Sequence, residues 1–219
     1  MKILGLEFSS PQRSVAAVEV RAEEPLVLAE VIETGPGSMR PLAMIEEALR
    51  QARIEREQIE CLAVGLGPGS YTGIRTAIAL AQGWQLGRGI KLLGISSAEC
   101  IAAEAQAAGL TGRVHVIIDA QRNEFYLAAY ELKPAQRRGL SPLRLACSSE
   151  VQQGLASGGL LVGPEVTRWF PEGRLLFPRA ATLARLSVGE TDFLSGEELG
   201  PIYLRETSFV KAPPPRIIP

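Results

Sequence analysis

The sequence predicts an α/β protein in which one βββαβα unit occurs twice, forming two lobes. Strand-like and helix-like segments follow each other in the same order in both halves, and the first strand of each half ends in an acid, Glu7 or Asp119. The 219 residues, 46% of them hydrophobic, can bury a large core. We expect an N-terminal lobe at residues 1–110 and a smaller C-terminal lobe at residues 111–219.

The first half opens with three strand-like runs, Lys2–Phe8, Arg13–Val20 and Val27–Glu33, separated by turn-forming residues. Short consecutive strands joined by turns predict an antiparallel meander. From Arg40 onward, hydrophobic residues recur at helical spacing between charged residues, which predicts an amphipathic helix. Cys61–Leu66 then predicts a short buried strand.

The remainder of the first half predicts a helix, a strand and a third helix. Thr72–Leu86 is rich in alanine and is expected to end near Gly87 or Gly89, because glycine readily takes the left-handed conformation that closes a helix. The segment KLLGI predicts a fifth strand. Ser96, followed three residues later by Glu99, predicts a capping box at the start of the third helix.

The second half repeats this order of elements without repeating the residues. Residues 114–132 contain a hydrophobic strand ending in an acid, a polar turn and a second strand, and Leu143–Cys147 is the candidate third strand. Ser149 is placed to cap a short helix, GGLLVG and RLLF predict short strands, and RAATLARLSVG predicts a helix. A duplicated βββαβα unit with a cleft between its halves is typical of actin, hexokinase and Hsp70. The pattern therefore predicts this actin-like (ASKHA, RNase H-like) architecture.

The composition of the chain bears on which classes of function it can have and on the cellular compartment in which it acts. The formal net charge is −1 and the basic residues are scattered, so we expect no strong nucleic-acid binding by this chain alone. Cys61, Cys100 and Cys147 are an odd number at wide spacings, which fits neither a disulfide framework nor a zinc site. We find neither a secretory signal nor the roughly 20 apolar residues of a membrane span. These features predict a cytoplasmic protein with reduced, structural cysteines.

The segment GLGPGSYTGIR, residues 65–75, leaves the buried strand and enters a helix. Free backbone N–H groups at a helix start favour an anion. The segment nevertheless lacks the Lys and Ser/Thr pair of a Walker A loop and the spacing of a GxGxxG loop. A tight strand-to-helix connection that needs glycine would also explain it. Phosphate binding, a structural connection and a docking surface therefore stay open.

The helix after this loop carries two further signals. Arg75 lies in its first turn, where the helix dipole disfavours a positive charge by about 0.3–1 kcal/mol. We therefore expect an anionic partner, either a phosphate or a carboxylate of this chain or of another protein. Small residues, among them Gly73, Ala77 and Ala81, would let another helix approach closely. Packing against the sheet and a protein interface are both consistent with them.

Candidate catalytic residues are few. The single histidine, His115, lies within a strand on the face of Ile117 and Asp119, and we interpret it as a hydrogen-bonded strand residue. We expect no histidine-based zinc or iron site, because no second histidine is available. A Ser-His-Asp triad that uses His115 lacks support, because the GxSxG motif is absent. Glu7 and Asp119 could together hold Mg²⁺ in an actin-like cleft. The loops after them lack the glycines that let backbone approach phosphate, so we interpret the cleft as vestigial.

The segment GLGPGSYTGIRTAIALAQGWQLGRGIKLLGISSAE strongly resembles the TsaB family, also called YeaZ. KILGLEFSS, DAQRNEFYLAAY and PIYLR are similar to further landmarks of that family in the same order. The resemblance implies an actin-like two-lobed fold and a role in forming N6-threonylcarbamoyladenosine (t6A) beside the anticodon of tRNA. It further implies a non-catalytic subunit that pairs with the metal-bearing transferase TsaD, is joined by the P-loop ATPase TsaE, and forms a homodimer when alone.

The resemblance also implies where contacts are made. Pairing in the family uses the helices that correspond to residues 40–54 and 72–86, and the loop before the second helix would hold it near partner and nucleotide contacts. We expect no cofactor on this chain alone, with ATP or ADP possible at the interface of the complex, and tRNA reached only through the complex. The candidate loop residues are Gly67, Pro68, Gly69, Ser70, Tyr71, Thr72, Gly73 and Arg75. The candidate interface residues are Arg40, Met44, Glu47, Ala77, Ala81 and Trp84.

Two other functions remain as alternatives: an active ATPase or phosphotransferase that uses Glu7 and Asp119, and a peptidase. The sequence also departs from the family pattern at three positions. Glu7 stands where the family usually has aspartate, and Gly37 and Met39 stand where histidine and glutamate are common. The proline-rich tail KAPPPRIIP is expected to be extended, and we assign it no role.

Overall fold

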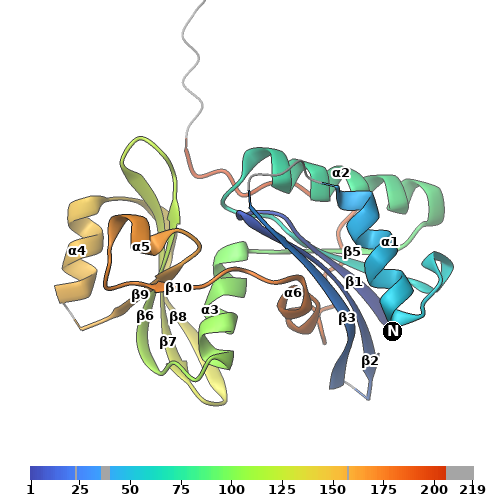
Figure 1. Cartoon of the computed structure of the whole chain (residues 1–219), viewed down its shortest axis with the longest axis horizontal. Helices are drawn as coiled ribbons and strands as arrows, with labels where there is room; N and C mark the ends of the chain where they lie inside the picture. The colour runs from blue at the N-terminus through green and yellow to red at the C-terminus, as the bar shows by residue number, and fades with distance from the viewer. Residues whose placement is uncertain (23, 36–39, 157, 206–219) are drawn as a thin grey trace, which may run out of the picture.

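The computed structural model describes residues 1–22, 24–35, 40–156 and 158–205, which form two lobes, each built on a five-stranded sheet (Figure 1). The strand order is β3-β2-β1-β4-β5 in the first sheet and β10-β9-β6-β7-β8 in the second. Each sheet combines a three-stranded antiparallel meander with two parallel strands that follow helices. The equivalent order in both sheets confirms the predicted duplicated α/β fold.

Both halves follow the order β, β, β, α, β, α, β, α. The first half consists of β1 (Lys2–Glu7), β2 (Gln12–Arg21), β3 (Glu24–Thr34), α1 (Pro41–Ala52), a 3₁₀ turn (Arg56–Gln58), β4 (Cys61–Gly65), α2 (Tyr71–Arg88), β5 (Lys91–Ile95) and α3 (Ser97–Ala107). The second half consists of β6 (Gly112–Asp119), β7 (Glu124–Lys133), β8 (Gln136–Cys147), α4 (Ser148–Ala156), β9 (Leu160–Gly163), α5 (Val166–Trp169), β10 (Arg174–Leu175) and α6 (Ala180–Leu186).

Several predicted details differ from the structure. β8 is longer than predicted because its pairing with β7 continues back to the hairpin turn, and the short helix α5 was not predicted. α4 begins at Ser148, so Ser149 lies inside the helix and does not cap it. The predicted capping box is wrong: Ser96 is the N-cap of α3, but its side chain makes no capping hydrogen bond. Glu99 instead forms an ion pair with Arg137 at 3.2 Å, which removes it from the cap.

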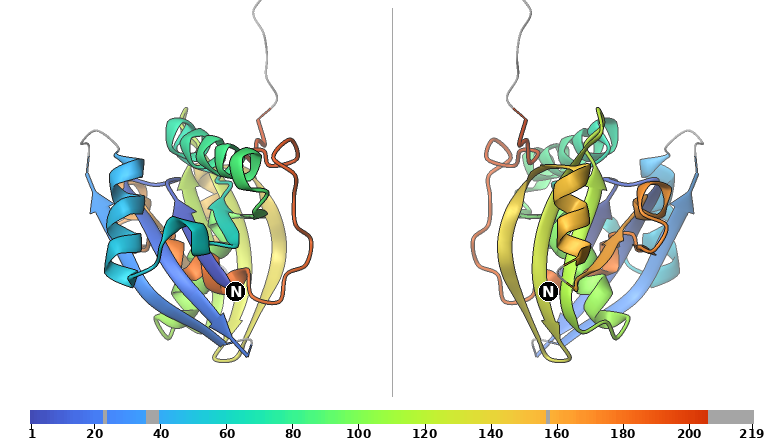
Figure 2. Two further views of the ribbon diagram at one scale, coloured as in Figure 1. Left: turned by 90° about the vertical axis from the view of Figure 1, so that its right-hand side faces the viewer. Right: turned by 90° about the vertical axis from the view of Figure 1, so that its left-hand side faces the viewer.

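Helices cover both faces of the first sheet (Figures 1 and 2). α1 and α2 lie on one face, where their apolar residues pack on Leu4 and Leu6 of β1. α6 lies on the opposite face, where Ala180 and Leu183 pack on Ile3. Side chains alternate between the two faces along β1, as they must in a strand.

The last helix of each half packs on the sheet of the other half. Ile101 and Ala105 of α3 pack against β6 of the second sheet, whereas α6 covers the first sheet. α3 and α6 also contact each other, and both lie between the two sheets (Figure 1). All strands of the first sheet precede residue 110 and all strands of the second follow it. The boundary at residue 110 as a domain division stays a prediction, since these two helices cross it.

The chain after α6 returns along the first lobe. The Leu194 amide donates to the Leu92 carbonyl at 2.9 Å, and the Ile202 amide donates to the Leu66 carbonyl at 2.9 Å. No helix in the described part of the chain is long and apolar enough to cross a membrane. The departures at Gly37 and Met39 and the tail KAPPPRIIP lie outside the described residues.

Candidate functional site

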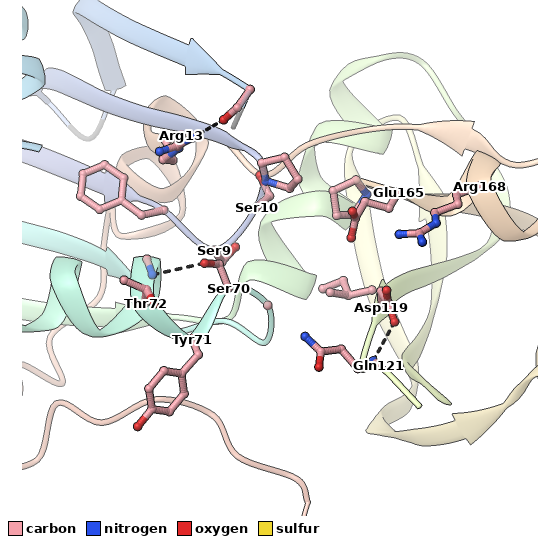
Figure 3. A pocket seen from close by; sticks show the side chains of 17 residues that line it. Ser9, Ser10, Arg13, Ser70, Tyr71, Thr72, Asp119, Gln121, Glu165 and Arg168 are labelled. Atoms are coloured by element: carbon pink, nitrogen blue, oxygen red, sulfur yellow. Dashed lines mark hydrogen bonds between the residues drawn. The ribbon is translucent and has the colours of Figure 1, made fainter. Parts of the chain in front are cut away.

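A cleft of about 850 Å³ separates the lobes at the carboxyl ends of their central strands (Figure 3). The first lobe contributes the turn after β1, with Ser9 and Ser10, and the first turn of α2. The second lobe contributes Asp119 at the end of β6 and the segment after β9, which includes Glu165 and Arg168. Ligands of α/β proteins commonly bind outside the carboxyl ends of strands, so this cleft is the leading candidate for a small-molecule site.

Sequence reasoning did not identify several of these lining residues. Ser9 and Ser10 were recognised only as turn formers, although a polar turn directly after a buried strand is a usable signal. Arg168 carries no such signal, because it reaches the cleft only through α5, which sequence periodicity did not predict. Two basic side chains, Arg13 and Arg168, and two acidic ones, Asp119 and Glu165, line the cleft, so it has no strong charge of either sign.

The glycine loop holds the start of α2 against the end of β1 by backbone contacts. The Ser70 amide donates to the Ser9 carbonyl at 2.7 Å, and Ser70 Oγ accepts from the Gly73 amide at 3.3 Å, which caps the helix. A Cβ atom on Gly73 would lie 1.9 Å from the Phe8 carbonyl oxygen. One on Gly69, where φ is +147°, would lie 2.1 Å from the Ser9 carbonyl oxygen. Close backbone approach therefore explains these glycines and favours the structural interpretation of the loop.

The two acids that the sequence pairs are separated in the structure. Asp119 lines the cleft, and its Oδ1 accepts from the Gln121 amide at 2.7 Å (Figure 3). Glu7 is fully buried and is not among the residues lining the cleft. Its Oε1 accepts from the Ser9 amide at 2.7 Å, and its Oε2 accepts from the Ser97 hydroxyl at 2.9 Å. Glu7 thus joins β1 to the start of α3, and of these two acids only Asp119 could meet a ligand in the cleft.

Burial raises the pKa of Glu7, because desolvation outweighs the hydrogen bonds that Ser9 and Ser97 donate to it. The folded protein therefore holds this proton to a higher pH than the unfolded chain does. Ionisation of Glu7 must then lower the free energy of unfolding as pH rises from the unfolded pKa through the folded pKa.

We expect Glu7→Gln to be more stable than the wild type near pH 8 and to lose that advantage near pH 4. Glutamine is neutral throughout, and its oxygen can still accept from the Ser9 amide. Urea unfolding of both proteins across this pH range measures the difference. Glu46→Gln, which changes an exposed glutamate of α1, is the control. A stability difference that does not vary with pH would contradict the assignment of a desolvated carboxyl.

Three of the six predicted interface residues are buried inside the first lobe. Met44 is 1% exposed, and Ala77 and Ala81 are 0% exposed, all facing the sheet. These three assignments are wrong as partner contacts, because the residues are covered by their own chain. The small size of the two alanines lets α2 approach the sheet closely.

Uncharged residues are exposed along α2 and at the start of α1, beside the exposed charged residues Glu46 and Arg50 of α1. We call the uncharged part the α1–α2 face. Arg40, Glu47 and Trp84, the other predicted interface residues, reach the surface of these helices at least in part. Residues 76–87 contain no charged side chain, although an exposed helix surface normally carries charges. Leu42 is 59% exposed and Leu86 is 92% exposed. The α1–α2 face comprises Leu42, Ala43, Ala79, Gly83, Leu86 and Gly87, all of them exposed.

Arg75 contacts two tyrosines. Its Nε donates to Tyr203 Oη at 3.0 Å, and its guanidinium lies 4.5 Å from the centre of the Tyr71 ring. In the part of the chain that the structure describes, no carboxylate forms an ion pair with Arg75, so the expected anionic partner is not found there. Tyr71 and Tyr203 border a smaller cavity of about 150 Å³ beside the cleft. The sequence assigned no site role to Tyr203, which lies 128 residues from Arg75.

His115 lies on the Ile117 face of β6, as predicted, and away from the cleft. Its ring packs on the backbone near Gly154 and Gly159, where a Cβ atom would come within 3.2 and 2.4 Å of it. Nε2 has no hydrogen-bond partner among the described residues, so the predicted hydrogen bond is not found at this nitrogen. Burial and the charge of Arg113 lower its pKa.

The described ranges contain no group of three or more histidine, cysteine, aspartate or glutamate side chains arranged to bind a metal. All three cysteines are free. Cys61 and Cys100 are buried, and burial raises the pKa of Cys61 to about 12, which keeps it a thiol. Cys147 is exposed, so its side chain does not contribute to the core as those of Cys61 and Cys100 do.

Comparison with known proteins identifies related sequences. A family model described as "TsaD: tRNA N6-adenosine threonylcarbamoyltransferase" matches residues 38–191. A protein of Escherichia coli named "tRNA threonylcarbamoyladenosine biosynthesis protein TsaB" is 28% identical over 188 residues, which cover 77% of this chain and 80% of the relative. A protein of the same name from Haemophilus influenzae is 33% identical over 130 residues, which cover 58% of this chain and 53% of the relative.

Solved structures show the same fold. A crystal structure from Pseudomonas aeruginosa, described as an uncharacterized protein with similarity to peptidase YEAZ, matches with a TM-score of 0.77 and 25% identity. A structure described as YeaZ from the same organism matches with a TM-score of 0.76 and 24% identity. Each match covers 93% of this chain and 99% of the other. Together with the two duplicated sheets, these matches confirm the two-lobed actin-like fold.

Proposed function

Because the chain belongs to the TsaB (YeaZ) family, within the wider family described as TsaD, we propose that it is a subunit of the machinery that forms N6-threonylcarbamoyladenosine in tRNA. Its relatives are named for the biosynthesis of this nucleoside. We propose further that it acts in the cytoplasm as a non-catalytic scaffold that pairs with a TsaD-type catalytic subunit, which a TsaE-type ATPase then joins. The tRNA is bound mainly by that assembly.

The α1–α2 face is the observation that carries this proposal. Its uncharged residues, with Leu42 and Leu86 largely exposed, would be covered by the equivalent helices of the partner. Gly83 and Gly87 have no atom within 4 Å of a Cβ position, so a second helix can approach the backbone there. Burial of apolar surface contributes about 25 cal/mol per Å², offset by the cost of association. Without the partner, a second copy of this chain would cover the same face.

The arrangement of the acids supports a non-catalytic role. The actin-like ATPase alternative needs Glu7 and Asp119 together in the cleft, but Glu7 is enclosed by β1, Ser9 and the start of α3. The Glu7–Asp119 pair that the alternative assigns to Mg²⁺ is therefore not present in the cleft. We therefore propose that this chain binds no cofactor by itself and that ATP or ADP is bound only in the assembled complex.

Reconstitution tests this function. We expect unmodified tRNA, an activated threonylcarbamoyl donor and the TsaD-type subunit of the same organism to form little modified nucleoside without this chain, and much more when this chain is added. Mass spectrometry of the digested tRNA measures the product. This chain with tRNA and the threonylcarbamoyl donor, but without the TsaD-type subunit, should form none. Product formed by this chain alone, or no effect of its addition, would contradict the scaffold role.

A further inference from the structure

Tyr71, Arg75 and Tyr203 form an exposed aromatic and cationic surface at the edge of the cleft, which we call the tyrosine platform. Tyr71 is 60% exposed and Tyr203 is 53% exposed. Their ring centres are 6.4 Å apart and their planes differ by 31°. Arg75 contacts both residues, through the hydrogen bond to Tyr203 and the stacking contact with Tyr71. Two large rings of this kind leave much apolar surface in water unless a ligand covers them.

The chain holds Tyr203 in place from both sides. On one side, the Ile202 amide donates to the Leu66 carbonyl at 2.9 Å. On the other, the Arg205 guanidinium donates to the Ala120 carbonyl at 3.1 Å and to the Glu124 carboxylate at 2.5 Å. Tyr71 is fixed as the first residue of α2. These contacts position the backbone on both sides of Tyr203, and such positioning reduces the entropy lost when a ligand binds.

Arg75 is available to an anion as well as to the rings. Its guanidinium has five N–H donors, of which Tyr203 Oη accepts one, and no carboxylate in the described ranges pairs with it. Its position in the first turn of α2 is disfavoured by the helix dipole, so a bound anion would relieve an existing cost. The two tyrosine rings can stack on a nucleobase, and the guanidinium, which lacks a carboxylate partner, can pair with the phosphate of the same nucleotide.

The small cavity beside the platform adds polar groups at the edge of the rings. It is lined by Tyr71, Tyr203 and Tyr126 together with Asp119 and Gln121. At about 150 Å³ it is smaller than typical small-molecule pockets of roughly 300–1,000 Å³, so it suits part of a ligand, such as one planar base. Amide and carboxylate groups can hydrogen-bond to the edges of an unpaired base.

We propose that the tyrosine platform binds an unpaired nucleobase of RNA by stacking on Tyr203 and Tyr71, with the adjoining phosphate paired to Arg75. The proposal deepens the proposed function and rests on it: this chain then contacts the RNA of the modification complex directly, by a single stacked nucleotide. Such a contact needs no broad basic surface, which agrees with a net charge of −1. It also gives the PIYLR segment a role.

Fluorescence anisotropy with a labelled single-stranded RNA of about ten nucleotides, in low salt, tests the proposal. We expect the wild-type chain to bind this RNA and Tyr203→Leu to bind at least about fivefold more weakly, because base stacking on one ring contributes that much or more. Tyr203→Phe keeps the ring and should retain most of the binding. Arg75→Met should reduce the slope of log affinity against log salt by about 0.7, the value for one lost phosphate contact on a single strand.

Arg50→Met is the matched control, since it also removes one surface arginine, from an ion pair with Glu47 on α1. It should leave RNA binding unchanged. No binding by the wild type, alone or in complex with the TsaD-type subunit, would overturn the proposal. Equal binding by wild type and Tyr203→Leu would overturn it as well. If Tyr203→Leu lost pairing with the TsaD-type subunit while RNA binding persisted, the platform would be a protein contact.

These outcomes are separable from the proposed function. If the chain stimulates tRNA modification but the platform variants bind RNA normally, only this inference fails. If the chain binds RNA through the platform but does not pair with or stimulate the TsaD-type subunit, the proposed function fails.

Discussion

Gly73→Ala is expected to destabilise the protein by about 2–3 kcal/mol, whereas Gly83→Ala in the same helix is expected to stabilise it by about 0.5–1 kcal/mol. A methyl group on Gly73 would lie 1.9 Å from the Phe8 carbonyl oxygen, so α2 or the end of β1 must move. At Gly83 the space is open within 4 Å, so alanine adds only its higher helix propensity. The same glycine-to-alanine substitution is therefore expected to change the stability in opposite directions at two positions of α2.

Urea unfolding of the two variants and the wild type at low protein concentration measures this pair of effects. Low concentration keeps any pairing of copies through the α1–α2 face from adding to the stability. If Gly73→Ala were as stable as the wild type, the close backbone contact between the glycine loop and β1 would not exist in solution. Destabilisation by Gly83→Ala would instead show that this side of α2 is covered within the chain.

Ala79→Glu is expected to weaken pairing with the TsaD-type subunit at least about 30-fold, while Ala77→Glu is expected to unfold the first lobe. Ala79 is exposed on the α1–α2 face, so a glutamate there would place an unpaired charge in an apolar interface. Ala77, two residues earlier, is 0% exposed against the sheet, so the same change puts the charge into the core.

Circular dichroism and titration with the labelled TsaD-type subunit distinguish the two variants. Ala107→Glu, at an exposed position of α3, is the control and should fold and pair like the wild type. Normal pairing by a folded Ala79→Glu would place the interface elsewhere. A folded Ala77→Glu would show that α2 does not pack on the sheet as described.

The sequence predicted most of the fold because local periodicity is strong and occurs twice. The order of strands and helices in each half was sufficient to predict two equivalent sheets. The exchange of α3 and α6 between the sheets could not be read from periodicity, which shows that a helix has an apolar side but not which sheet covers it. The capping box failed for a similar reason, because the carboxylate of Glu99 pairs with Arg137, 38 residues away.

The candidate site was less predictable. Glu7 and Phe8 lie on opposite faces of β1 by strand alternation, but only the packing of α3 shows that the Glu7 side is enclosed. Ala77 and Ala81 share helical spacing with apolar residues, and small residues suit packing on a sheet as well as packing on a partner helix. The contact between Arg75 and Tyr203 joins distant segments with no local pattern to reveal it.

Size-exclusion chromatography with light scattering, on this chain alone and mixed with the TsaD-type subunit of the same organism, tests the central claim most directly. The scaffold role predicts a homodimer of the chain alone, replaced on mixing by a one-to-one complex that Ala79→Glu fails to form. Two species that elute separately at micromolar concentration, with no complex in the wild-type mixture, would contradict it.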